Sequence, residues 1–136
     1  MSFFASLASL LGGASFGPEH LDQLRAEHPG TLLLDVRTRA EYVQGHIDGS
    51  TLVPLDQLSA SLTQIAAAPA PIIVICHSGA RASTAATALR RAGKADVHVL
   101  GGGVSSWGNH GRKLSPGAKD VSLRDAIKKA RQAVAT

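Results

Sequence analysis

The sequence predicts an α/β fold, in which a mostly parallel sheet of four or five strands has helices packed on both faces. Apolar runs of strand length, such as Thr31–Val36 and Pro71–Ile75, show no alternation of polar and apolar residues, which is typical of strands covered on both faces. Segments with apolar residues at helical spacing separate these runs. Strands that alternate with helices form parallel sheets, and 136 residues suffice for one such core.

In the first half of the chain, proline or glycine stands at the end of most expected elements. Pro18 sets the backbone of a first helical turn, and Gly45 ends a short helix. The expected elements are, in order, a helix from Pro18 to Pro29, the strand Thr31–Val36, a short helix Arg37–Gln44, the strand Ser50–Pro54 and a helix from Leu55 to Ala66.

The second half continues the alternation of strands and helices. The expected elements are the strand Pro71–Ile75, a helix from about Arg81 to Ala92, the strand Asp96–Leu100 and a short helix around Trp107. Gly93 ends the first of these helices, and Gly101-Gly102-Gly103 predicts a turn after the second strand.

The chain divides into three parts. Residues 1–13 have apolar residues at helical spacing and predict a short N-terminal helix, whereas residues 14–112 hold the alternating strands and helices. Residues 113–136 form a linker and then a basic amphipathic helix, with an apolar stripe of Leu123, Ile127, Ala130 and Val134 beside Arg124, Lys128 and Arg131. We expect this helix to dock on the domain. A basic partner-binding helix is the alternative, and a homodimer through the terminal helices is a further expectation.

Composition excludes several classes of protein. The one cysteine cannot form an intramolecular disulfide or a cysteine-rich zinc site, and the histidines are scattered, so neither a metal nor another cofactor is expected. No stretch reaches the ~18 apolar residues of a transmembrane helix, and no basic residue precedes the apolar N-terminus as in a secretory signal. We therefore expect a cytoplasmic protein without a membrane span.

Charge is distributed unevenly along the chain. Residues 1–80 carry three basic and seven acidic side chains, and residues 81–136 carry eleven and three, for a net charge of +4. A basic half favours anionic substrates or partners. Aromatic residues are not interleaved with the basic ones and no nucleic-acid-binding motif is present, so nucleic acid is not expected as a partner.

Cys76 stands where an α/β sheet places its functional groups. It follows the strand Pro71–Ile75 and begins the loop Cys76-His77-Ser78-Gly79-Ala80-Arg81, which leads into a helix. Ligands of such sheets bind at the carboxyl ends of the strands, and the N–H groups of a loop and helix start form an anion site. These groups and Arg81 favour the charged thiolate over the thiol. The alternative interpretation is an inert cysteine buried at a strand end.

Several motifs occur in one order along residues 16–111. These are Asp35-Val36-Arg37, Glu41-Tyr42, Gly45-His46-Ile47-Asp48-Gly49-Ser50, Cys76-x4-Arg81, and Gly101-Gly102 followed by Trp107. The set resembles the rhodanese family, which implies a rhodanese-like three-layer α/β/α domain and transfer of sulfane sulfur through a cysteine persulfide. Four residues separate Cys76 from Arg81, which is similar to the sulfurtransferase form of the loop; related phosphatases have one residue more.

Each candidate residue has an expected role, and the resemblance implies the roles of Cys76 and its loop. Cys76 is the catalytic nucleophile, and the anion-binding loop consists of His77, Ser78, Gly79, Ala80 and Arg81. Arg81 orders the loop or binds the anion, and a structural ion pair is the alternative for its side chain. Asp35, at the end of a neighbouring strand, is expected to hydrogen-bond the loop. Arg37 and Glu41 are expected to form an ion pair, because they are four residues apart. His46 is expected in a tight turn, with Ile47 pointing inward. The resemblance implies that thiosulfate or another persulfide donor supplies the sulfur, and that cyanide or a thiol accepts it.

Two other functions remain open. A non-catalytic binding or regulatory module on the same scaffold is the first, although such modules typically lose the cysteine. A cysteine-dependent phosphatase or arsenate reductase is the second, and the loop length disfavours it. The loop interior, His77 to Ala80, has no permanently charged side chain, which leaves the donor unassigned. A protonated His77 would attract an anionic donor.

Overall fold

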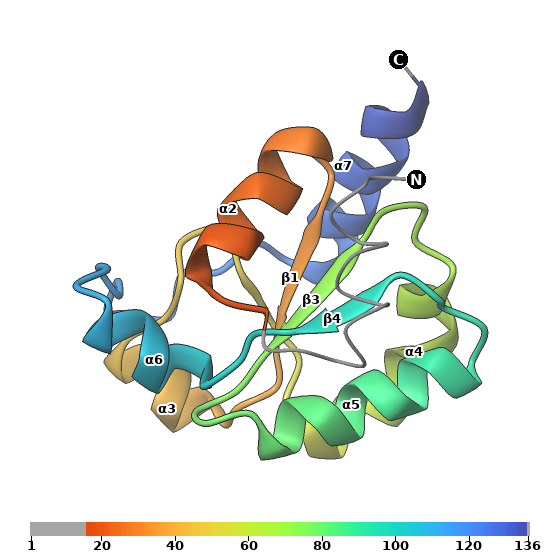
Figure 1. Cartoon of the computed structure of the whole chain (residues 1–136). Helices are drawn as coiled ribbons and strands as arrows, with labels where there is room; N and C mark the ends of the chain where they lie inside the picture. Colours follow the sequence, from red (N-terminus) through yellow and green to blue (C-terminus); the bar gives the residue numbers. More distant parts are fainter. Residues whose placement is uncertain (1–15, 136) are drawn as a thin grey trace.

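A computed structural model describes residues 16–135 (Figure 1). The helices are α2 (Pro18–Glu27), α3 (Arg39–Gln44), α4 (Leu58–Ala66), α5 (Ala80–Arg91), α6 (Gly103–Asn109) and α7 (Leu123–Ala135), with a short 3₁₀ helix η1 at Leu55–Gln57. The strands are β1 (Leu32–Asp35), β2 (Thr51–Leu52), β3 (Ile72–Ile75) and β4 (Val97–Val99). The helix expected within residues 1–13 lies outside the described residues. None of the described helices is long and apolar enough to cross a membrane.

The four strands form one parallel sheet in the order β2-β1-β3-β4. The central pair, β1 and β3, is in register from Leu32 opposite Ile72 to Asp35 opposite Ile75. The short strand β2 pairs with the end of β1, and β4 pairs with β3. The predicted parallel sheet is therefore confirmed, with four strands.

A helical layer covers each face of the sheet, as predicted (Figure 1). Leu32 and Leu34 belong to a core with residues of α4, α5 and α7, whereas Leu33, Ile73 and Ile75 belong to a second core with residues of α2 and α6. Successive residues of a strand point to opposite faces, so a strand covered on both faces is apolar nearly throughout. All four positions of β1 and of β3 are buried for this reason.

The parallel arrangement brings three loops together at the carboxyl ends of the strands. β1, β3 and β4 are neighbours and all end on this side of the sheet. The loops that follow them are the segment after Asp35, the Cys76 loop and Gly101-Gly102-Gly103. A backbone hydrogen bond joins the ends of β1 and β3, where Val36 N–H donates to Ile75 O at 2.9 Å. The fold thereby assembles the motifs that are far apart in the sequence.

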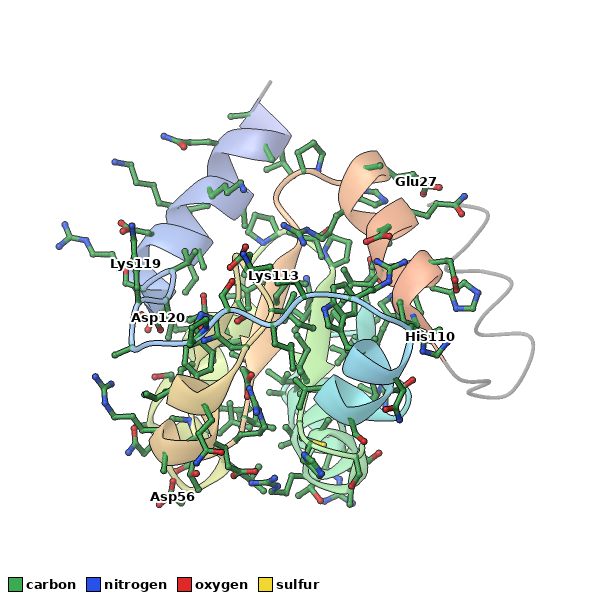
Figure 2. The ribbon with its side chains drawn as sticks, turned by 90° about the vertical axis from the view of Figure 1, so that its left-hand side faces the viewer. Glu27, Asp56, His110, Lys113, Lys119 and Asp120 are labelled. Carbon is green, nitrogen blue, oxygen red and sulfur yellow. The ribbon has the colours of Figure 1, made fainter. Side chains whose placement is uncertain are left out.

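A connecting segment crosses the molecule from α6 to α7. Figure 2 shows it running from His110 past Lys113 to Lys119 and Asp120. Near its end, Asp120 accepts a hydrogen bond from the backbone N–H of Leu52 at 3.1 Å. The backbone N–H of the next residue, Val121, donates to the carbonyl before β2. The segment therefore lies against β2.

Helix α7 docks on the sheet, as expected from its apolar stripe. Ala126, Ile127 and Ala130 are buried, and a Cβ on Gly30 would lie 2.9 Å from Ala130 Cα, so the glycine permits the close approach. The prediction that Val134 belongs to the buried face is wrong, because its residue is 62% exposed. Val134 lies in the last turn of α7, which projects beyond the sheet (Figure 1). The homodimer stays a prediction.

Replacing Ile127 by alanine is expected to lower the free energy of unfolding by about 2–5 kcal/mol, because removal of a buried side chain leaves a cavity. Ile127 is only 3% exposed and packs in the core beneath α7. Val134→Ala is the matched control on the same helix and should change stability by less than about 0.5 kcal/mol. Urea unfolding followed by circular dichroism measures both, and equal effects would contradict this docking of α7.

Candidate active site

Cys76 lies at the carboxyl end of β3, directly after four fully buried residues. Cys76 is 1% exposed, whereas the next two residues, His77 and Ser78, are exposed to solvent. The loop turns back at Gly79, whose φ of +120° is disfavoured for any residue with a side chain. This turn brings the Gly79 N–H to 2.8 Å from Cys76 Sγ, where it donates a hydrogen bond to the sulfur.

The first turn of α6 supports the Cys76 loop from behind. Val104 N–H donates to Cys76 O at 2.9 Å, and Ser105 N–H donates to His77 O at 3.1 Å. A trans peptide places its N–H opposite its C=O, so the N–H groups that follow these two carbonyls point away from α6. The loop is thereby oriented with carbonyls toward α6 and donors toward its other side.

Gly103 makes this contact possible. Its φ is +57°, and a Cβ at this position would overlap Cys76 O and lie 2.5 Å from His77 O. The sequence predicts only a turn at Gly101-Gly102-Gly103, and the structure confirms that turn. The role of α6 as the support of the loop could not be found from the sequence, apart from the signal of three glycines after a strand.

Arg81 joins the end of the Cys76 loop to α3. Its Nη1 and Nη2 contact Glu41 Oε1 and Oε2 at 2.6 and 2.8 Å, a bidentate ion pair that is about one third exposed. Glu41 is also held by Thr38, whose hydroxyl caps α3. The hydrogen bonds from Arg81 lower the pKa of Glu41 from 4.5 to about 2, against the opposing effect of burial. Arg81 is therefore fixed by its own partner.

The expected ion pair between Arg37 and Glu41 is wrong. Arg37 precedes the first residue of α3, so the helical spacing rule does not apply to it. It instead forms a buried bidentate pair with Asp35, with Nη2 at 2.8 Å from Oδ2, and donates to Gly45 O. Both oxygens of Asp35 accept from Arg37. The expected hydrogen bond from Asp35 to the Cys76 loop is not present among the described residues.

His46 is buried away from solvent in a tight turn. Its Nδ1 lies 3.0 Å from Tyr42 O, and its ring stacks on the Tyr42 ring at 3.9 Å between centroids. Its backbone exchanges two hydrogen bonds with Ser115 in the connecting segment. Ile47 is 2% exposed, which confirms that it points inward. These contacts give His46 a supporting place in the fold.

Within residues 16–135, no cluster of three or more histidine, cysteine or carboxylate side chains is suited to hold a metal ion. The chemistry available at the loop is that of a thiol with a backbone donor at its sulfur and an exposed histidine beside it. A comparison with known families matches residues 18–110 to the rhodanese-like domain. The chain belongs to this family.

Several curated relatives of this rhodanese-like domain are named sulfurtransferases. A protein of Allochromatium vinosum named "Sulfurtransferase" is 33% identical over 93 residues, covering 68% of this chain and 86% of the relative. "Thiosulfate sulfurtransferase GlpE" of Pseudomonas fluorescens is 36% identical over 90 residues, covering 66% of this chain and 80% of the relative. Among solved structures, a rhodanese-related protein from Thermoplasma volcanium is similar with a TM-score of 0.65 and 26% identity, covering 74% of this chain and 96% of that one.

Gly103→Ala is expected to loosen the Cys76 loop, because the added Cβ would push α6 away from the two loop carbonyls. The variant should be less stable, and iodoacetamide should alkylate Cys76 faster than in the parent protein. Gly111→Ala is the matched control: Gly111 also has positive φ (+74°), but a Cβ there would meet nothing within 4 Å. It carries only the backbone strain of about 1–2 kcal/mol. Equal alkylation rates in the two variants would contradict the role of Gly103.

Glu41→Gln is expected to reduce the loss of stability at acid pH. The pKa of Glu41 is lowered in the folded protein, so its contribution is fully present above about 4.5 and is lost as the pH falls toward about 2. The parent protein should therefore lose stability over this range, and the variant should lose less. Urea unfolding at several pH values measures the difference. Glu27→Gln removes an exposed carboxylate that forms no ion pair within the described residues, and this control should follow the parent.

Proposed function

We propose that this protein is a sulfurtransferase that carries a sulfane sulfur as a persulfide on Cys76. The single observation that supports it most directly is the hydrogen bond from Gly79 N–H to Cys76 Sγ. The names of two relatives, "Sulfurtransferase" and "Thiosulfate sulfurtransferase GlpE", agree with this proposal. The free thiol suits the reducing conditions of the cytoplasm.

The first step is a displacement at sulfur. The Cys76 thiolate attacks the sulfane sulfur of thiosulfate, a new S–S bond forms, and the S–S bond of the donor breaks. Sulfite leaves with the bonding electron pair, so no proton or external oxidant is needed. The product, Cys76–S–S⁻, is an anion at the start of the 12-residue helix α5. Backbone N–H groups and the positive end of that helix stabilise it.

The second step returns the enzyme to its starting state. A nucleophilic acceptor, either cyanide or a thiolate, attacks the outer sulfur, and the S–S bond to Cys76 breaks. The electron pair returns to Cys76 Sγ as the thiolate, and the acceptor leaves as thiocyanate or a persulfide. Donor and acceptor react in separate steps, so ping-pong kinetics are expected.

The charges around the loop bear on the choice of donor. Arg81 is paired with Glu41 through both carboxylate oxygens, so its charge is largely compensated. His77, which is exposed, is the one residue of the loop interior that can gain a positive charge. A doubly charged donor such as thiosulfate therefore meets little fixed positive charge here. We propose that a persulfide of a small thiol, such as glutathione persulfide, serves as a donor beside thiosulfate.

Mass spectrometry of the intact protein tests this function. Incubation with thiosulfate or glutathione persulfide should add one sulfur atom to Cys76, and cyanide should then remove it with release of thiocyanate. Cys76→Ser should neither take up the sulfur nor show thiosulfate:cyanide activity. Both donors are compared at equal concentration, and loading of Cys76 by thiosulfate alone would contradict the proposal that a persulfide is also a donor. Full activity in the serine variant, or no adduct with either donor, would rule out the persulfide mechanism.

A further inference from the structure

A groove lies between α4 and α7, outside the candidate active site. Its volume is about 290 Å³, and its lining residues are Gln64, Arg124, Ile127, Lys128, Arg131 and Gln132. Ile127 is buried and is the one apolar residue of the lining, whereas the other five lining residues are exposed. We name this feature the α4–α7 groove.

The α4–α7 groove concentrates uncompensated positive charge. Arg124, Lys128 and Arg131 follow one another at helical spacings of four and three, so they share one face of α7. None of the three forms an ion pair with any residue in the range 16–135. The facing helix α4 has the sequence LSASLTQIA and no charged residue. Asp56 of η1 lies at the far end of the molecule from α7 in Figure 2.

Two kinds of polyanion fit the groove poorly. An amphipathic helix binds a membrane surface through its apolar face, and that face of α7 is already buried against the sheet. Single-stranded nucleic acid binds on aromatic side chains that stack with its bases, and the lining of the groove includes none. The occupant must therefore be recognised by charge and hydrogen bonding from exposed arginine, lysine and glutamine.

The dimensions of the groove suit a few side chains rather than a whole small molecule. Pockets for drug-sized ligands start at roughly 300 Å³, so this groove lies at the lower limit. Five of its six lining residues have a charged or amide side chain. The rise of α7 between its three cations is about 6 Å and about 4.5 Å. Alternate residues of an extended peptide are about 6.6 Å apart, which brings successive carboxylates within reach of these cations. Gln64 and Gln132 add amide groups that can bond a peptide backbone.

We propose that the α4–α7 groove binds an extended acidic peptide segment of a partner protein. Arginine guanidinium groups pair with carboxylates in a bidentate manner, which makes glutamate or aspartate side chains the matching ligands. The groove lies toward the amino ends of the strands, whereas Cys76 lies at their carboxyl ends. Gln64 is in the last turns of α4, shortly before β3 begins, and Cys76 directly follows the carboxyl end of β3. A partner bound there leaves the Cys76 loop accessible. This inference does not depend on the proposed sulfur transfer.

Fluorescence anisotropy with a fluorescein-labelled oligoglutamate peptide tests the proposal on the full chain. The parent protein should bind the peptide, and added salt should weaken binding because exposed ion pairs are screened. The triple variant Arg124→Gln/Lys128→Gln/Arg131→Gln should bind about ten-fold more weakly, since each exposed ion pair contributes a few-fold at most. The matched control Arg39→Gln/Arg91→Gln/Lys113→Gln removes three exposed cations outside the groove and should bind like the parent.

Folding and site specificity are checked separately. Both triple variants should unfold at the same urea concentration as the parent. In the parent protein, peptide titration should shift the side-chain amide NMR signals of Gln64 and Gln132, which line the groove. Equal loss of binding in the two triple variants, or unshifted glutamine signals, would overturn the site. Single-stranded DNA and phosphatidylserine vesicles are tested in the same way. If either binds more tightly than oligoglutamate, and only the groove variant loses this binding, the groove does not bind an acidic peptide.

Discussion

Two backbone hydrogen bonds from the first turn of α6 to the carbonyls of Cys76 and His77 hold the candidate site in shape. The loop alone is short, and three of its residues are exposed, so its own packing cannot fix the direction of its peptide groups. By bonding the carbonyls on one side, α6 leaves the donors free on the other. Gly103 is required because only a residue without Cβ fits between α6 and the loop. The geometry at the sulfur therefore depends on a helix that follows a different strand.

Electrostatic pairing organises the surroundings of this loop without adding net charge to it. Asp35 and Arg37 neutralise each other in a buried pair, and Glu41 and Arg81 do so at the surface. Removing one partner of the buried pair would leave an uncompensated charge, which is strongly destabilising. Arg37 also donates to Gly45 O at the end of α3, and Arg81 joins the first turn of α5 to Glu41 of α3. Helix α7, by contrast, carries four basic side chains and one acidic one, and none of these forms an ion pair within residues 16–135.

The fold and the position of the nucleophile were accessible to sequence reasoning because they depend on local pattern. Uninterrupted apolar runs mark β1 and β3, and Cys76 directly follows one of them. The ion pairs were not accessible in this way, because Arg81 at the start of α5 meets Glu41 of α3, forty residues earlier, only in the folded chain. Spacing along one helix suggested a different partner for Glu41, and Val134 shared the apolar spacing of α7 although the sheet does not extend beneath it. Motif order identified the family, whereas tertiary packing decided which side chains meet.

The segment before α7 also protects the sheet from other chains. An edge strand with unpaired backbone groups is a template for association between molecules. β2 is an edge strand, but Asp120 accepts a hydrogen bond from the Leu52 N–H of β2. The chain then continues beside β2 into α7. At the opposite edge, Phe16 bridges Leu100 just beyond β4. Residues that flank the family match, which covers 18–110, thus bond the backbone of β2 and the backbone just beyond β4, and at β2 they disfavour edge-to-edge association.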